Sequence, residues 1–81
     1  MKAAQVAIWI SERGEDWVLK RHYDPESPID YAGKRVEEIA AEPVMLDKCG
    51  REERGGKEVW CCVYRTKGGR VFDVWEKKEV S

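Results

Sequence analysis

The sequence predicts an α+β fold, with the element order β-β-α-β-β-β in a single small domain over residues 1–81. Apolar residues alternate with polar ones in five short segments, which is the period of half-buried strands. One further segment has helical spacing and a helix-start signal. A chain of 81 residues has room for one core. The sequence therefore predicts one helix packed on a mostly antiparallel sheet.

The first two strands are predicted to form a hairpin with its turn at residues 13 and 14. Ile10 then faces Trp17 across the hairpin. One face carries the apolar side chains Val6, Ile8, Ile10, Trp17 and Leu19. The opposite face carries Trp9 and Val18 among polar neighbours. We expect the first of these faces to join the core.

The helix is predicted to begin at Ser27, with Pro28 in its first turn and Asp30 near the positive end of the helix dipole. Six apolar or small residues recur at helical spacing: Ile29, Ala32, Gly33, Val36, Ile39 and Ala40. Pro43 ends the helix, because proline has no amide to donate. This single stripe is enough to cover one face of a small sheet.

Three more strands are predicted after the helix, joined by two glycine turns. In chain order the segments are a strand that begins at residues 44–46, a turn at 54–56, a strand over 58–65, a turn at 67–69 and a strand over 70–76. With residues 54 and 55 at the centre of the first turn, Glu52 faces Lys57 and Arg51 faces Glu58. Both are favourable pairs of opposite charge.

Alternation divides the last two strands between two faces. One set is assigned to the core because it matches the helix stripe in size: Val59, Cys61, Val63, Phe72 and Val74. The other set points away from the helix: Trp60, Cys62, Tyr64, Val71, Asp73 and Trp75. Because one helix covers one face, we expect the second face to stay open.

The open set predicts a partner-binding surface rich in aromatic side chains. Its residues are Trp9, Trp60, Tyr64, Val71 and Trp75, with Arg65 and Arg70 at the rim. Contiguous apolar patches in water mark interfaces, and tryptophan, tyrosine and arginine are the usual hot-spot residues. The alternative is structural: the tryptophans stack across strands and stabilise the sheet, or the C-terminal tail covers them.

No motif points to catalysis, a metal or a cofactor. His22 is the only histidine, so any triad or metal site would have to be built around it. Cys49, Cys61 and Cys62 lack the spacing of zinc ligands, and the glycine pairs lack the pattern of a phosphate loop. We therefore expect a protein that is not an enzyme, binds no cofactor and holds no metal.

The charges are nearly balanced, with 15 basic and 16 acidic residues. A dedicated nucleic-acid binder usually has a basic excess, and a DNA mimic has an acidic one. Three cysteines, an odd number, and no apolar signal segment indicate the cytoplasm, where thiols stay reduced. The apolar stretch of residues 3–10 is too short to cross a bilayer.

Three function classes fit these observations. The first is a non-enzymatic module that binds a protein partner through the aromatic face. The second is a single-stranded nucleic-acid binder that stacks bases on the same face and contacts phosphates with its arginines. The third is a small homodimer whose aromatic faces meet.

In its length, its high charge content and its lack of a diagnostic motif, the whole chain resembles the small phage-encoded inhibitors of bacterial defence known as anti-CRISPR proteins. The resemblance implies a cytoplasmic protein of the bacterial host cell that binds a subunit of a CRISPR–Cas effector complex. It also implies inhibition without catalysis, by blocking target-DNA binding or nuclease recruitment. No single residue is assigned a role by this resemblance.

Overall fold

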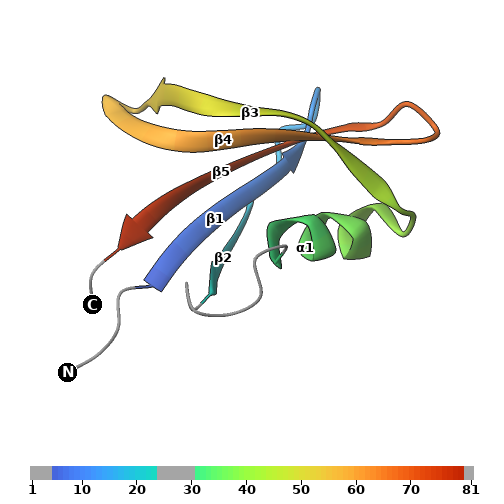
Figure 1. The fold of residues 1–81 in the computed structure, drawn as a ribbon, viewed down its shortest axis with the longest axis horizontal. Coiled ribbons are helices and arrows are strands. Elements are labelled where there is room, and N and C mark those ends of the chain that lie inside the picture. Colours follow the sequence, from blue (N-terminus) through green and yellow to red (C-terminus); the bar gives the residue numbers. More distant parts are fainter. Residues whose placement is uncertain (1–4, 24–30, 80–81) are drawn as a thin grey trace.

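A computed structural model describes residues 5–23 and 31–79, which form one helix and five strands (Figure 1). In chain order the elements are β1 (Gln5–Glu12), β2 (Leu19–Tyr23), α1 (Tyr31–Ala40), β3 (Val44–Arg54), β4 (Lys57–Thr66) and β5 (Val71–Glu79). The predicted α+β class and the predicted order β-β-α-β-β-β are confirmed.

The five strands form one sheet in the order β2-β1-β5-β4-β3, and every pair of neighbours is antiparallel. α1 lies in the connection between β2 and β3, which are the two edge strands. The chain has to cross the width of the sheet at this point, and α1 lies on the face over which it crosses (Figure 1). β5 joins the β1–β2 hairpin to the β3–β4 hairpin, because it pairs with both β1 and β4.

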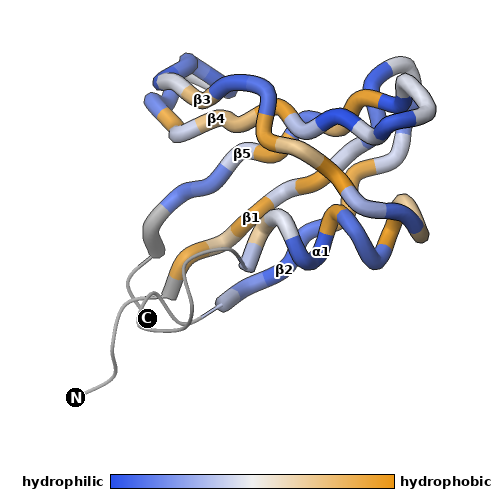
Figure 2. Tube along the Cα trace, turned by 45° about the vertical axis from the view of Figure 1, so that its right-hand side comes forward, coloured by the Kyte–Doolittle hydropathy of each residue, from blue (hydrophilic) through white to orange (hydrophobic). Residues whose placement is uncertain are grey.

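The hydrophobic core lies between α1 and one face of the sheet. Its buried side chains come from α1, β1 and β5: Ile8, Ile10, Val36, Ala40, Phe72 and Val74. Ala32 and Ile39 of the predicted helix stripe pack against this cluster, as does Tyr64. In Figure 2 the hydrophobic stretches of β1 and α1 adjoin, whereas β2 and the tip of the β3–β4 hairpin are hydrophilic. Burial of this set is the dominant favourable contribution to folding.

α1 ends at Ala40, three residues before Pro43, where the sequence predicts the helix to stop. Ala41 adopts a left-handed conformation with φ 60°, and its amide donates to the carbonyl of Glu37 at 2.8 Å. Such a left-handed residue just after the last turn is a common way for a helix to end. The predicted helix start, residues 27–30, lies outside the described residues.

The β4–β5 connection is a three-residue loop that ends at Gly69, where φ is 95°. A loop of three residues pairs even-numbered positions with even-numbered ones, so Tyr64 lies opposite Phe72 and Cys62 lies opposite Val74. The predicted match between the two strands is therefore wrong. The α1 face carries Trp60, Cys62, Tyr64, Phe72 and Val74. The opposite face carries Val59, Cys61, Val63, Val71, Asp73 and Trp75.

The loop of the first hairpin is longer than predicted. β1 keeps pairing with β5 beyond its end, because the amide of Arg13 donates to the carbonyl of Val71 at 2.8 Å. The chain then turns at Gly14, with φ 93°, before β2 begins at Leu19. Ile10 therefore faces Leu19 instead of Trp17, which is 37% exposed in the loop. The shift is by two residues, so Leu19 stays on the α1 face as predicted.

The β3–β4 turn also lies one residue later than predicted, at Gly55 and Gly56, with φ 60° and 79°. Two successive left-handed residues make the hairpin turn that matches strand twist. The predicted direct pairs of residues 51–58 and 52–57 are therefore wrong, since Arg51 lies opposite Trp60. Arg51 still forms an ion pair with Glu58, at 3.4 Å along the diagonal of the ladder.

β3 carries a bulge at Asp47. Leu46 lies opposite Tyr64 and Lys48 lies opposite Val63, so Asp47 is an extra residue in the ladder. Asp47 forms an ion pair with Arg65 at 3.0 Å. The extra residue brings the side chain of Lys48, and with it the even-numbered positions that follow in β3, to the face opposite α1.

Candidate functional site

The face of the sheet opposite α1, here called the open face, carries one continuous row of side chains across all five strands. Each member lies directly opposite the next in the ladder, in the strand order β2, β1, β5, β4 and β3. This tryptophan row consists of Lys20, Trp9, Trp75, Cys61 and Gly50. Residues opposite each other in an antiparallel ladder share a face, so the row is a direct consequence of the register.

Two half-buried indole rings form the centre of the row. The rings of Trp9 and Trp75 are parallel to within 5°, with centroids 6.4 Å apart. The ammonium of Lys20 lies 5.0 Å from the Trp9 centroid, and the guanidinium of Arg54 lies 4.5 Å from the Trp75 centroid. Because Lys20 and Arg54 come from opposite edges of the sheet, the order is cation, indole, indole, cation. Each ring thus has one cation over it and the other indole parallel to it.

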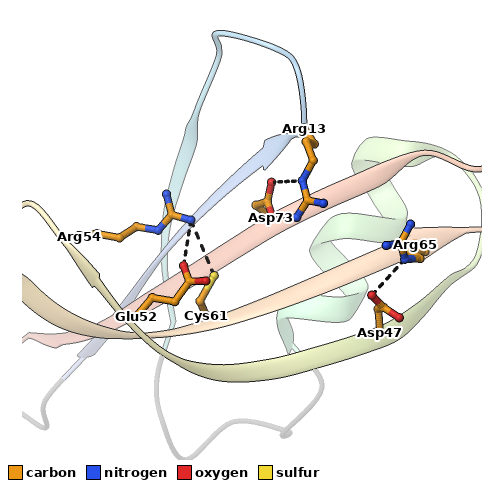
Figure 3. Close-up of polar contacts among 7 residues, drawn as sticks. All are labelled: Arg13, Asp47, Glu52, Arg54, Cys61, Arg65 and Asp73. Carbon is orange, nitrogen blue, oxygen red and sulfur yellow. Dashed lines mark hydrogen bonds and ion pairs between the residues drawn. The ribbon is translucent and has the colours of Figure 1, made fainter.

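Arg54 folds back from the tip of the β3–β4 hairpin over the row (Figure 3). It donates to a carboxylate oxygen of Glu52 at 3.2 Å and approaches the sulfur of Cys61 at 3.9 Å. Burial is the first cause that raises the pKa of the Cys61 thiol, followed by its hydrogen bond with Glu52. Cys61 is buried together with Val59 and Val63, on the face that α1 does not cover. The sequence predicts that these side chains are buried against the helix, whereas they are buried on the open face.

The open face bears three arginine–carboxylate pairs among the described residues (Figure 3). Arg13 holds both carboxylate oxygens of Asp73, at 2.6 and 3.2 Å. The other two are the Arg54 pair with Glu52 and the Arg65 pair with Asp47. The register places four lysines on the same face: Lys20, Lys48, Lys57 and Lys77. Its described side chains are therefore net positive, in a chain whose formal net charge is −1.

A hollow of about 170 Å³ adjoins the tryptophan row at its β3 end. Its lining comes from β3 and β4: Lys48, Cys49, Gly50, Arg51, Glu52, Cys61 and Val63. Gly50 contributes no side chain, and a Cβ placed there would meet no atom within 4 Å. The hollow is therefore a consequence of the glycine in the row, and a side chain at position 50 would fill it.

The seven predicted binding residues do not share one face. Four lie on the open face: Trp9, Arg65, Val71 and Trp75. Trp60, Tyr64 and Arg70 lie toward α1, because the β4–β5 loop sets the opposite match between these strands. The stacking that the sequence offers as an alternative is present for the Trp9–Trp75 pair. The C-terminal residues 80 and 81, offered as a cover for the tryptophans, lie outside the described residues.

Tyr64 and Arg70 have structural contacts. Tyr64 packs against the core, and its ring lies 3.5 Å from the position that a Cβ on Gly33 would take. Arg70 donates to both carboxylate oxygens of Glu12, at 2.9 and 2.8 Å, and to the carbonyl of Ala40 at 2.9 Å. Arg70 thus joins the β4–β5 loop to β1 and to the last turn of α1. Trp60 is 45% exposed on the α1 face.

Sequence reasoning missed three members of the tryptophan row, Lys20, Cys61 and Gly50, and also missed Arg54, whose guanidinium lies over Trp75. The signal for Arg54 was present, because the two glycines after it favour a turn in which Arg54 is the last strand residue. Lys20 and Gly50 had no local signal, since their membership depends on the order of the strands.

Within residues 5–23 and 31–79, no three histidine, cysteine, aspartate or glutamate side chains are grouped so that they could hold a metal ion. The helix that the structure describes is not long and apolar enough to cross a membrane. Among known proteins, no family model, no curated protein and no solved structure matches the chain. Its function is therefore inferred from the open face.

Proposed function

We propose that the chain is a non-enzymatic protein-binding module whose partner docks on the open face. The observation that carries the proposal is the tryptophan row: two stacked indoles between two cations, on the face that α1 does not cover. Tryptophan and arginine are enriched at the centre of interfaces. In this row, partial burial already holds the two indoles in place. A preordered anchor of this kind loses little conformational entropy on binding.

Two features favour a protein partner over single-stranded nucleic acid. Base stacking needs a free ring face, whereas a cation already lies over each indole and the two rings are parallel to each other. The arginines that would contact phosphates in a nucleic-acid complex are each paired with a carboxylate of the same face. Ring edges and ion pairs suit the mixed apolar and polar surface of a protein.

The charge of the open face supports a partner with an acidic rim. The described open face carries three arginines and four lysines against the three carboxylates of the arginine pairs, so its basic groups exceed its acidic ones. Such an excess accelerates association with a surface of opposite charge, and added salt reduces this effect. The hollow at Gly50 then receives a side chain of the partner next to the apolar centre.

The resemblance to anti-CRISPR proteins supplies the class of partner to test first, a subunit of a CRISPR–Cas effector complex. A net positive face does not imitate DNA. Inhibition in this proposal therefore comes from covering the subunit, so that target DNA or the nuclease cannot bind.

The test measures binding of the purified chain to a panel of purified CRISPR–Cas effector complexes and to a labelled single-stranded oligonucleotide. Trp75→Ser removes the centre of the row, and Trp60→Ser is the matched control on the other face. Loss of an interface anchor typically costs about 2 kcal/mol or more, which is roughly a 30-fold weaker Kd. We expect this loss for Trp75→Ser and near-native binding for Trp60→Ser, with circular dichroism to show that both variants fold.

Gly50→Arg provides a second variant: a Cβ at position 50 meets no atom within 4 Å, the longer side chain occupies the hollow, and we expect it to weaken the same complex. Loss of binding with Trp60→Ser alone would move the interface to the α1 face and overturn the proposal. Tight binding to the oligonucleotide that falls steeply with salt would replace it with the nucleic-acid function. A stable dimer in solution that Trp75→Ser dissociates would replace it with the homodimer.

A further inference from the structure

Two cysteines face each other across the β3–β4 hairpin on the α1 face. Cys49 lies directly opposite Cys62 in the ladder, and the Cys49 thiol is one of the groups that raise the pKa of Cys62. Directly opposed residues of an antiparallel pair have Cα atoms about 4.5–5.5 Å apart. Disulfides span Cα distances of about 4.4–6.8 Å. The Cα separation expected of a directly opposed pair therefore falls within the range that a disulfide spans.

We propose that Cys49 and Cys62 are a reversible cross-strand disulfide site, oxidised by exchange with a low-molecular-weight disulfide such as oxidised glutathione. The site is independent of the partner proposed for the open face, because both thiols lie on the other side of the sheet.

The reaction proceeds in two exchange steps. The thiolate of Cys49 attacks one sulfur of oxidised glutathione, forms a mixed disulfide and releases one glutathione thiolate. The sulfur of Cys62, after losing its proton to solvent, attacks the sulfur of Cys49 and releases the second glutathione. Two cysteine thiols are oxidised to one disulfide, and one glutathione disulfide is reduced to two thiols. Excess reduced glutathione reverses both steps.

The surroundings of the two thiols set the order of these steps. Cys49 is exposed, whereas Cys62 is 8% exposed. Burial, the hydrogen bond with Cys49 and the nearby carboxylate of Glu76 raise the pKa of Cys62 to about 12, against the opposite effect of a hydrogen bond with Trp60. The exposed thiol therefore attacks first, since only a thiolate is an effective nucleophile. The buried thiol closes the bond, aided by its position beside the mixed disulfide.

Cys61 is an internal control provided by the chain itself. It has the same thiol group as Cys49 and Cys62 but lies on the open face, near Arg54. The residue opposite it is Gly50, which has no sulfur. Neighbouring residues of a strand point to opposite faces, so Cys61 cannot replace Cys62 in the bond.

The test incubates the reduced, full-length chain with oxidised glutathione and follows its intact mass, the linked peptides and its thermal unfolding. We expect the loss of two hydrogen atoms, a link between residues 49 and 62, and a rise in Tm of roughly 10–20 °C, because the bond closes the hairpin loop. Cys61→Ser should react like the wild type. Cys62→Ser should stop at a glutathione adduct on Cys49, and Cys49→Ser should form no bond with Cys62.

Three results would overturn this inference. They are a wild-type chain that keeps a stable glutathione adduct, a link that joins two chains through Cys49, and a link that involves Cys61. Cys49→Ser changes an exposed side chain and should fold, so the comparison holds even where Cys62→Ser is unstable.

Discussion

Trp9 on β1 and Trp75 on β5 lie directly opposite each other in the ladder, with parallel rings and centroids 6.4 Å apart. This pair joins the first strand of the chain to the last one. It therefore lies in the middle of the sheet, where the β1–β2 hairpin meets the part formed by β3, β4 and β5. The same two rings both stabilise this junction and form the centre of the proposed binding face.

A double-mutant cycle with Trp9→Ala and Trp75→Ala measures the contribution of the pair to stability. Stacked aromatic pairs contribute about 0.5–1.5 kcal/mol beyond the area that they bury. We expect the loss of unfolding free energy in the double variant to be smaller than the sum of the two single losses by about this amount. Urea unfolding monitored by circular dichroism measures all three losses. Strictly additive losses would mean that the rings lie beside each other without energetic coupling.

Phe72→Ala tests the core beneath α1. Phe72 is fully buried, and removal of a buried phenylalanine ring costs about 3–5 kcal/mol. A domain of this size has a stability of only several kcal/mol, so we expect the variant to lose much of it and to unfold at a far lower urea concentration. Leu46→Ala is the matched control, because Leu46 is 56% exposed and its truncation should cost less than about 1 kcal/mol. Equal losses in the two variants would contradict the assignment of the core.

The β3–β4 turn needs glycine at a left-handed position. Gly55 has φ 60°, and a side chain in this conformation costs roughly 1–2 kcal/mol. We expect Gly55→Ala to lose about this much stability in urea unfolding. Gly50→Ala is the control in the adjoining strand β3, because a Cβ at Gly50 meets no atom within 4 Å and no left-handed φ is required. A neutral Gly55→Ala would show that the turn relaxes to another type.

The Glu12–Arg70 contact makes stability depend on acid pH. The hydrogen bonds from Arg70 are the main cause that lowers the pKa of Glu12 from its usual value of 4.5. A carboxylate with a lowered pKa stabilises the folded state above its unfolded pKa and loses this effect as the pH falls through its folded pKa. We expect wild type to be more stable than Glu12→Gln at neutral pH, and the difference to shrink below about pH 4.5.

Urea unfolding of both chains between about pH 7 and pH 3 measures this difference, and Glu53→Gln at the exposed hairpin tip is the matched charge control. A gap between wild type and Glu12→Gln that stays constant down to pH 3 would show that the contact does not shift the titration of Glu12.

The elements themselves could be predicted because their signals are local. Alternation in residues 6–10 and 59–64 identifies strands, and the spacing of Val36 and Ala40 identifies the side of the helix that is buried. The helix stop before Pro43 follows from the missing amide of proline. These features depend on backbone sterics and hydrogen bonding within a few residues.

The candidate site was predicted only in part, since faces depend on loop lengths. The sequence analysis placed Trp60 and Trp75 on one face, whereas they lie on opposite faces of the sheet. The three-residue β4–β5 loop sets this register, because one residue more or less in a loop exchanges the two faces of the following strand. The bulge at Asp47 has the same effect within β3. The bulge has no strong local signal, whereas the turn at residues 67–69 is predicted from the sequence and only its effect on the two faces was missed.

The sequence by itself determined which segments form strands and helix, how many there are, and that their aromatic residues exceed what one helix can cover. The tertiary structure alone decided which aromatic residues meet. Trp9 and Trp75 become neighbours because β5 is placed between β1 and β4, a pairing of the two ends of the chain that no neighbouring residues specify. Lys20, Arg54 and Gly50 join them for the same reason. Non-local strand order is set by the total burial of the sheet against α1, which only the whole fold defines.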